Sequence, residues 1–374
     1  MRMLITRQFP LDYPGGETSH LFGVAHEMRK IGHEIYLMPV TDHPSPASLW
    51  PPAFTRDVPP FGLHHLFDSF AISRAAADFL RTTPVDVILS WQYETAYLGA
   101  FTRARNFIHG MVTGTPFGLL KRMARRNPAR ALAYHFFHFR QLRQAQVIFC
   151  PSHYAKSELV QMLGLDPQKI VVTHLSADAV FQPAAQPASG PLKNFIFAGS
   201  FEPIKGLFDA IAALGLVAGQ GCRDWTLKIA GWGDTDAVLT AARAAGIAAH
   251  LQFLGRLDRP ALAEELAHAD LAILPSHTET FGLSIAEAQA CGVPVVSYAI
   301  GGIPEVVSPA ETGLLVPGFD QAALAQAILS LIQNPERARQ MGWRGAQTMR
   351  EKFSWAAAAQ QMIATLEELQ AQPR

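Results

Sequence analysis

Short apolar runs alternate along the chain with longer stretches in which apolar residues recur at helical spacing. The apolar runs, bounded by Gly, Pro or polar residues, predict buried β-strands at 2–6, 33–38, 85–90, 106–110, 146–150 and 169–174, and again at 194–199, 225–230, 251–256, 270–275 and 294–298. Helices are predicted between them, for example over 18–31 and 152–163, and from 320, 335 and 354 onward. Strands that alternate with helices in this way predict an α/β fold with parallel sheets.

The alternation stops between 176 and 192, where the run Gln-Pro-Ala-Ala-Gln-Pro-Ala-Ser-Gly-Pro has no hydrophobic period. At 374 residues the chain is long for one domain and comfortable for two. We therefore predict an N-terminal domain over 1–176, a linker over 177–192 and a C-terminal domain over 193–353, with a last helix over 354–374.

The composition is that of an ordinary globular protein, because 49% of the residues are hydrophobic, 17% are charged and the formal net charge is zero. The three cysteines, Cys150, Cys222 and Cys291, form no Cys-x-x-Cys pair, which favours a reducing compartment and argues against a zinc site. No apolar run approaches the ~18 residues of a membrane span, and the first residues lack the apolar segment of a signal peptide. We expect a cytoplasmic protein.

The charges are unevenly distributed. Between Thr95 and Ser157 the chain has ten basic residues and no acidic one, and Tyr134, Phe136, Phe137 and Phe139 lie among them. The segment 118–143 is predicted to form one or two helices. These could pack with a solvated rim, or could contact a phosphate-bearing acceptor or the anionic inner face of a membrane. No nucleic-acid-binding motif accompanies it, so we expect no nucleic acid partner.

One stretch, 276–288, combines several chemical features at the junction of a buried strand and an Ala-rich helix. Glu279 and Glu287 lie eight residues apart, which on one helix would set them roughly 80° apart rather than on one stripe. Gly282 permits a sharp helix entry, so we place Glu279 in the loop and Glu287 in the helix. A carboxylate at the carboxyl end of a strand, beside free helix N–H groups, is typical of a site for a phosphorylated ligand.

The frame Pro-Ser-x-x-Glu-x-Phe-Gly-Leu, with Glu287 eight residues after Glu279, resembles the signature of the family 4 retaining glycosyltransferases of the GT-B fold. The resemblance implies two Rossmann-like domains facing across a cleft, with the last helix returning to the first domain. It implies that Glu279 lies against the donor sugar and that Glu287 binds the nucleotide ribose. Phe281, Gly282 and Leu283 would then supply backbone N–H groups to the donor.

The first strand, glycine loop and helix also resemble this family. Gly15 and Gly16 precede the helix in an arrangement that can approach an anion, although a plain turn would look the same. His109 is predicted to close a strand before Gly110, and the resemblance implies a catalytic position near the transferred sugar; a lone histidine is otherwise usually structural.

In the second half the family has an Arg, four or five residues, and then Lys-Gly, and the two cations hold the donor diphosphate. Lys205 matches this pattern in Lys-Gly, whereas Ser200 stands where the Arg is expected. We expect the missing cation to weaken diphosphate binding by about 1.5–3 kcal/mol unless another residue replaces it. Gly231 ends the following strand, and Phe253 and Leu254 resemble the strand that contacts the nucleobase.

Two other motifs are weaker. Asp234-Thr235-Asp236 has the form of a metal-binding Asp-x-Asp triplet, but Asp is also the usual N-cap of a helix, and we favour the cap. Gly231-x-Gly233-x-x-Asp236 lacks the third glycine of a dinucleotide fingerprint. We therefore predict metal-independent transfer of a sugar from a nucleoside-diphosphate sugar to a saccharide, lipid-linked or other small acceptor, without a cofactor. The resemblance implies that this transfer retains the anomeric configuration. The alternatives are a non-catalytic nucleotide-sugar-binding protein and a dinucleotide-binding oxidoreductase.

Overall fold

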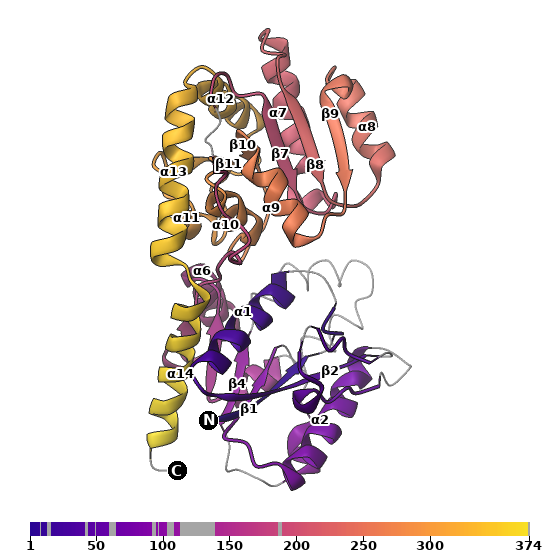
Figure 1. Cartoon of the computed structure of the whole chain (residues 1–374), viewed down its shortest axis with the longest axis vertical. Helices are drawn as coiled ribbons and strands as arrows, with labels where there is room; N and C mark the ends of the chain where they lie inside the picture. The colour runs from indigo at the N-terminus through magenta and orange to yellow at the C-terminus, as the bar shows by residue number, and fades with distance from the viewer. Residues whose placement is uncertain are drawn as a thin grey trace. The chain divides into compact units, whose positions relative to one another are not determined.

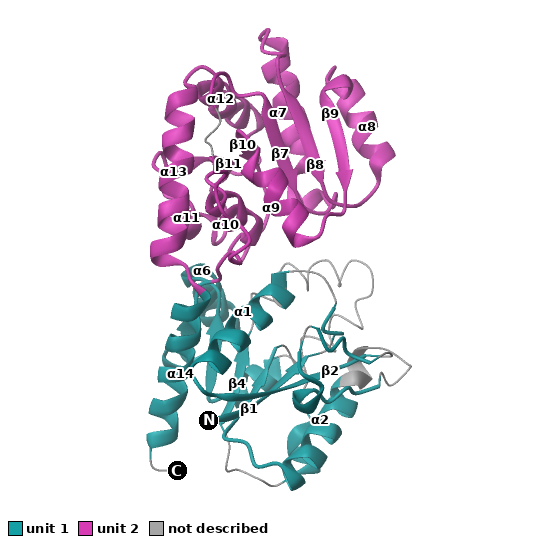
Figure 2. Cartoon of the chain, in the orientation of Figure 1, with its two compact units in different colours: residues 1–174, 355–374 teal, residues 175–354 magenta. Residues whose placement is uncertain are grey.

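The computed structural model describes residues 1–7, 9–12, 16–41, 44–48, 50–59, 65–91, 95, 97–102, 108–112, 139–185 and 189–372. The chain divides into two compact units, which Figure 2 colours separately: unit 1 is 1–174 with 355–374, and unit 2 is 175–354. The segment 177–192 belongs to unit 2, where Phe181 and Leu192 are buried in the core.

Unit 1 is built on a sheet of six parallel strands in the order β2-β1-β3-β4-β5-β6. Strands β1, β2 and β4 are labelled in Figure 1. Its strands are β1 (Arg2–Arg7), β2 (Glu34–Pro39), β3 (Val87–Ser90), β4 (Ile108–Val112), β5 (Val147–Cys150) and β6 (Ile170–Val172). Its helices are α1 (Gly16–Lys30), α2 (His65–Thr82), α3 (Leu98–Phe101), α6 (His153–Leu163) and α14 (Trp355–Ala371).

Unit 2 contains a second sheet of six parallel strands in the order β12-β11-β10-β7-β8-β9. Its strands are β7 (Asn194–Ala198), β8 (Thr226–Ala230), β9 (Leu251–Gly255), β10 (Leu271–Ile273), β11 (Val295–Tyr298) and β12 (Gly313–Val316). Its helices are α7 (Leu207–Gly219), α8 (Thr235–Ala244), α9 (Arg259–Ala267), α10 (Leu283–Ala290), α11 (Ile303–Val306), α12 (Gln321–Ile332) and α13 (Pro335–Lys352).

The helix starts follow from local chemistry. Ser152, Asp234, Asp258 and Asp320 are N-caps whose side chains each accept a hydrogen bond from a backbone amide three residues later. These bonds satisfy donors that the first turn of a helix leaves unpaired, and each cap stabilises its helix by about 1 kcal/mol. The sequence therefore fixes where the helices that follow β5, β8, β9 and β12 begin.

The last helix, α14, packs within unit 1. Its residues Ala359, Met362 and Leu366 are buried in the same core cluster as the strands of the first sheet. Its first residue, Trp355, lies against Gly23 of α1 so closely that a Cβ there would be 2.4 Å from the indole ring. The chain thus leaves unit 1 after 174 and re-enters it at 355 (Figure 1).

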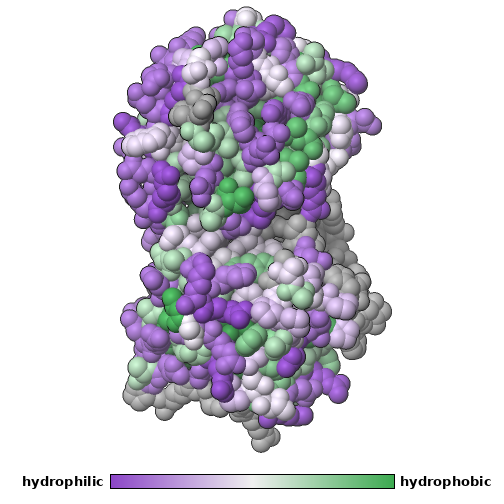
Figure 3. Space-filling view, in the orientation of Figure 1, coloured by the Kyte–Doolittle hydropathy of each residue, from purple (hydrophilic) through white to green (hydrophobic). Residues whose placement is uncertain are grey.

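The described surface is predominantly polar in the view of Figure 3, with smaller hydrophobic areas between the polar residues. Large hydrophobic side chains that are exposed include Met162 and Trp343, which lie on α6 and α13. Scattered exposed hydrophobic residues of this kind are normal for globular proteins.

Each sheet has one point at which the strand order reverses. In unit 2 the order grows outward in both directions from the neighbouring strands β7 and β10. The loops that follow these two strands leave the sheet in opposite directions, and the crevice between them is where open α/β sheets bind ligands. Lys205 follows β7 and Glu279 follows β10, so the fold brings the two predicted site residues to this crevice.

Candidate functional site

An ion pair lies at the crevice between β7 and β10. The Nζ of Lys205 donates to Oε1 of Glu279 at 2.6 Å, and the Ser276 hydroxyl donates to the same oxygen at 3.2 Å. The Glu279 side chain is 14% exposed and that of Lys205 is 34% exposed, so the pair is partly shielded yet reachable from solvent. An ammonium has three N–H donors, and Glu279 is the one hydrogen-bond partner of Lys205 Nζ among the described residues. Donors of this ammonium therefore remain for phosphate oxygens.

The Glu279 loop is fixed by backbone contacts with two other loops. The His277 amide donates to Ile204 O at 2.8 Å, beside Lys205, and the Gly302 amide donates to Glu279 O at 3.0 Å. A Cβ on Gly206 would lie 1.9 Å from Pro275 O, so this contact requires glycine. The carboxylate is therefore held by a loop that has little freedom to move.

The helix that follows this loop begins as predicted. Gly282 is its N-cap with φ 101°, a left-handed conformation that favours glycine, and α10 runs from Leu283. Glu279 thus lies in the loop and Glu287 in the helix, as the spacing predicted. The amides of Leu283 and Ser284 belong to the first turn, where N–H groups lack intrahelical acceptors and favour anions. Phe281 is buried, and its ring packs on Phe353 at 5.7 Å.

Glu287 is a buried carboxylate on α10, with a side chain that is only 7% exposed. The guanidinium of Arg259, the first residue of α9, donates to Glu287 Oε1 at 3.1 Å. Burial raises the pKa of Glu287 to about 7, although the contact with Arg259 favours the ionised form. The sequence analysis missed Arg259. A cation at the first position of a helix is unfavourable for the helix dipole, and this could have indicated an acidic partner.

The remaining predicted donor residues lie at the carboxyl ends of β7, β8 and β9. Ser200 follows β7 and is half-buried, and Gly231 follows β8. A Cβ on Gly231 would lie 1.8 Å from Gly199 O, so the two loops approach closely. Phe253 and Leu254 are half-buried residues of β9. These positions share one edge of the sheet with Lys205, as parallel strands require.

A second residue that the sequence analysis missed is the acidic Asp209, in the first turn of α7. Its Oδ2 accepts from His277 Nε2 at 2.6 Å and from Tyr298 OH at 3.1 Å, and its Oδ1 accepts from Gln321 Nε2 at 2.7 Å. Because His277 lies two residues before Glu279, Asp209 anchors the loop that carries Glu279. An acidic residue in a first turn is common, so nothing local distinguished Asp209.

The prediction for His109 was based on a wrong strand boundary. His109 is the second residue of β4, which continues to Val112, so it does not lie at the carboxyl end of the strand. Its Nε2 lies 2.9 Å from Thr95 Oγ1 and 3.3 Å from Ser90 Oγ, in a buried polar cluster that also includes Gln141. Burial lowers the pKa of His109 to about 4, which keeps the imidazole neutral. These contacts hold the ring in place within the cluster, and the catalytic role of His109 stays a prediction.

Two predicted features fall wholly or partly outside the described residues. Gly15 is not described, and Gly16 is the first residue of α1. Most of the basic segment 118–143 is also outside, since the description resumes at Phe139. There Arg143 stacks on the Phe139 ring at 4.4 Å.

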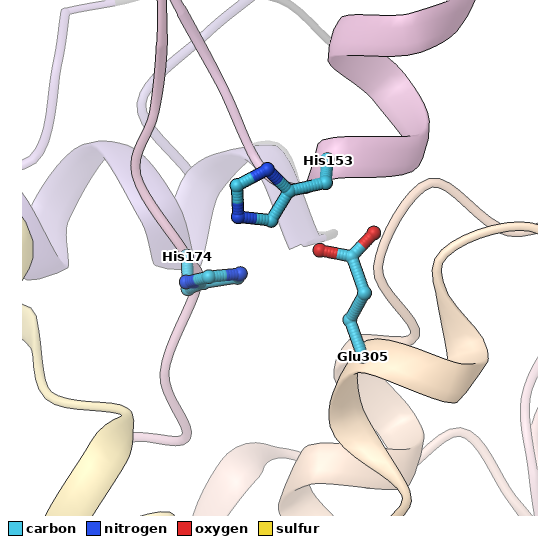
Figure 4. Close-up of side chains that lie close together, drawn as sticks. All are labelled: His153, His174 and Glu305. Atoms are coloured by element: carbon cyan, nitrogen blue, oxygen red, sulfur yellow. The ribbon is translucent and has the colours of Figure 1, made fainter.

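The Asp-x-Asp triplet has the geometry of a cap. Asp234 Oδ1 accepts from the Ala237 amide at 3.0 Å, and Asp236 lies in the first turn of α8. Figure 4 shows a separate group, His153, His174 and Glu305. His153 begins α6 and His174 follows β6, with rings 5.9 Å apart in unit 1, whereas Glu305 belongs to α11 of unit 2. We assign no metal centre to side chains divided between the two units.

The two doubly wound sheets, with the returning helix α14, define the GT-B class of glycosyltransferase folds. Two family models match the chain almost end to end: "Glycosyltransferase Family 4" over residues 14–179 and "Glycosyl transferases group 1" over residues 178–348. The chain belongs to this family of glycosyltransferases.

The relatives that it resembles have several different activities. The chain is 34% identical over 241 residues to glycogen synthase of Mycobacterium tuberculosis, covering 62% of this chain and 58% of that protein. It is 33% identical over 219 residues to D-inositol 3-phosphate glycosyltransferase of Segniliparus rotundus, covering 55% and 49%. The aligned regions thus span about half the length of these relatives.

Solved structures agree on the fold. Sucrose-phosphate synthase from Thermosynechococcus elongatus superposes with a TM-score of 0.81 at 20% identity, covering 99% of both chains. Anabaena HepE in complex with UDP-glucose superposes with a TM-score of 0.74 at 19% identity, covering 98% of this chain and 100% of that one. Among the described ranges, no helix has the length and apolarity to cross a membrane.

Proposed function

We propose that this protein transfers a sugar from a nucleoside-diphosphate sugar to an acceptor, with retention of the anomeric configuration and without a metal ion. The observation that carries the proposal is the Lys205–Glu279 pair at the strand-order reversal of unit 2. The family of the chain supports it, and HepE, which has the same fold, is known in complex with UDP-glucose. Synthesis of a glycan, polysaccharide or glycolipid is the process in which such a transfer takes part.

The proposed site would act by stabilising the negative charge that develops on the leaving diphosphate. When the bond between the sugar and the diphosphate breaks, negative charge grows on the diphosphate oxygens. The Lys205 ammonium and the first-turn amides of Leu283 and Ser284 are positioned at one edge of the sheet to stabilise that charge. Glu279 orients Lys205 through its 2.6 Å contact and offers its other oxygen to a sugar hydroxyl.

The test is release of nucleoside diphosphate from a panel of nucleotide-sugars by the purified protein, after dialysis against EDTA. We expect Glu279→Gln to abolish release while the fold is retained. Lys205→Ala should weaken donor binding about 10- to 150-fold, because a charge-assisted hydrogen bond is worth about 1.5–3 kcal/mol.

Lys228→Ala is the matched control, since Lys228 of β8 and Glu265 of α9 form an ion pair of similar length, 2.7 Å, within unit 2 but away from the crevice. Release at the wild-type rate by Glu279→Gln would refute the assignment of the site. Complete loss of wild-type release after EDTA treatment, restored by a divalent cation, would refute the metal-independent mechanism.

A further inference from the structure

Arg259 joins the buried carboxylate of Glu287 to the segment through which the chain enters unit 2. Its Nε lies 2.5 Å from Asp178 Oδ2, and its Nη1 donates to Glu287 Oε1 at 3.1 Å. The guanidinium also stacks on Phe181, with its carbon 4.8 Å from the ring centroid. One cation thus serves two carboxylates that come from different parts of the chain.

The two carboxylates that contact Arg259 differ in their exposure to solvent. Glu287 is 7% exposed, whereas Asp178 is 30% exposed, so Glu287 depends more on the cation for charge compensation. The Arg259 Nη2 atom is buried and has no hydrogen-bond partner among the described residues. The guanidinium therefore has unused donor capacity beside Glu287.

We propose that Arg259 is a positioning residue that keeps the Glu287 carboxylate ionised and aimed to accept hydrogen bonds from the ribose hydroxyls of the nucleotide, and that Asp178 weakens this effect by competing for the same guanidinium. The proposal rests on the proposed function, because it assumes that the site of unit 2 binds a nucleotide.

The physical basis is the balance of charges around Glu287. Burial raises the pKa of Glu287, Arg259 on α9 lowers it, and Asp178 raises it. Burial raises the pKa of the Cys291 thiol, which follows the last residue of α10, and the charge of Glu287 raises that pKa further. An ionised carboxylate accepts from two hydroxyls at once, whereas the protonated acid must donate its own proton and accepts fewer bonds.

Removing the cation or its competitor should therefore have opposite effects. In Arg259→Gln the ionised form of Glu287 loses its partner, so the pH below which nucleotide binding weakens should move upward. In Asp178→Asn the guanidinium is left to Glu287 alone, so that pH should move downward. Arg259→Lys restores the charge and should recover part of the binding.

The experiment measures binding by calorimetry from pH 6 to pH 9. The probes are ADP, GDP and UDP, the 2′,3′-dideoxy form of whichever binds the wild type, and inorganic pyrophosphate. For the wild type we expect affinity for the nucleoside diphosphate to fall as the pH drops through about 7. At pH 7, Arg259→Gln should bind it at least about tenfold more weakly, while binding the dideoxy form and pyrophosphate like the wild type.

The dideoxy probe separates positioning from a general structural effect. An equal loss of affinity for the dideoxy form would overturn the proposal, as would an unchanged affinity for the full nucleotide. If Arg259→Gln fails to fold, Asp178→Asn alone tests the inference. The inference is refuted if the pH midpoint of nucleoside diphosphate binding moves upward in Asp178→Asn or does not move. A wild type that binds neither pyrophosphate nor any nucleoside diphosphate would instead refute the proposed function, and the inference with it.

Discussion

Gly302 lies where no side chain fits, and its replacement by Ala should disturb the loop that carries Glu279. A Cβ on Gly302 would lie 2.3 Å from Thr280 O, 2.8 Å from Thr280 C and 3.1 Å from the Phe281 Cα. All three are backbone atoms, which cannot rotate away as a side chain would. The φ of Gly302 is −81°, so Ala can adopt its backbone conformation, and the whole cost of the substitution is steric.

The magnitude follows from the overlap. A carbon-to-oxygen contact of 2.3 Å is roughly 1 Å too short, so the loop at 279–281 or the turn at 301–302 has to shift by about that distance. Overpacking of this kind costs about 1–3 kcal/mol of folding free energy. A shift of about 1 Å in a positioned catalytic group costs about a hundredfold in rate. We therefore expect a folded protein whose release of nucleoside diphosphate is about a hundredfold slower.

The assay combines urea unfolding with the release assay, and Gly219→Ala is the control. Gly219 is the last residue of α7, and a Cβ there meets no atom within 4 Å, so that substitution should leave both stability and turnover near those of the wild type. Reduced stability with an unchanged rate in Gly302→Ala would show that the loop geometry does not control the chemistry. Unchanged stability and rate together would show that the close approach is not required.

Two further predictions concern stability and metal. Burial lowers the pKa of His20, which lies between Trp91 and Trp355, to about 3, so the folded state holds it neutral while the unfolded state protonates near pH 6.5. The free energy of unfolding of unit 1 should then fall as the pH drops below 6.5, by about 2 kcal/mol at pH 5. His20→Phe should remove this pH dependence in urea titrations followed by tryptophan fluorescence. An equal loss of stability at acid pH in both proteins would contradict the prediction. Asp234→Ala should lower the melting temperature of the protein, because a helix cap worth about 1 kcal/mol is lost. The release of nucleoside diphosphate should be unchanged, with or without EDTA. Slower release at unchanged stability would instead indicate a metal-binding role for the Asp-x-Asp triplet.

The sequence predicted the helices and strands well where capping residues and glycines agreed with the hydrophobic periodicity. Asp234 was expected to cap a helix and does so, and Gly282 was expected to permit the sharp entry to α10 and has the required positive φ. The strand 270–275 was predicted slightly longer than β10, because Leu274 and Pro275 are buried like strand residues although β10 ends at Ile273. These features depend on neighbouring residues, which the sequence displays directly.

The errors and omissions arose where contacts between residues far apart in the sequence determine the structure. His109 was placed at a strand end because Gly110 follows it, but Gly110 continues β4, where its missing side chain leaves room for Leu89 of the neighbouring strand. Arg259 and Glu287 are 28 residues apart in the sequence, and Arg259 and Asp178 are further apart still, so no local spacing relates them. Such pairs are formed by the packing of the whole unit and are visible only once the sheet order is known.

The return of α14 to unit 1 has a consequence for the order in which the protein is made. Residues Ala359, Met362 and Leu366 complete the core of unit 1 but are translated after all of unit 2. A nascent chain stalled when residue 354 has just left the ribosomal exit tunnel would expose unit 2 in full and unit 1 without its closing helix, so we expect unit 2 to resist protease on the ribosome before unit 1 does. The half of the chain that the ribosome begins second would then be the half that finishes folding first.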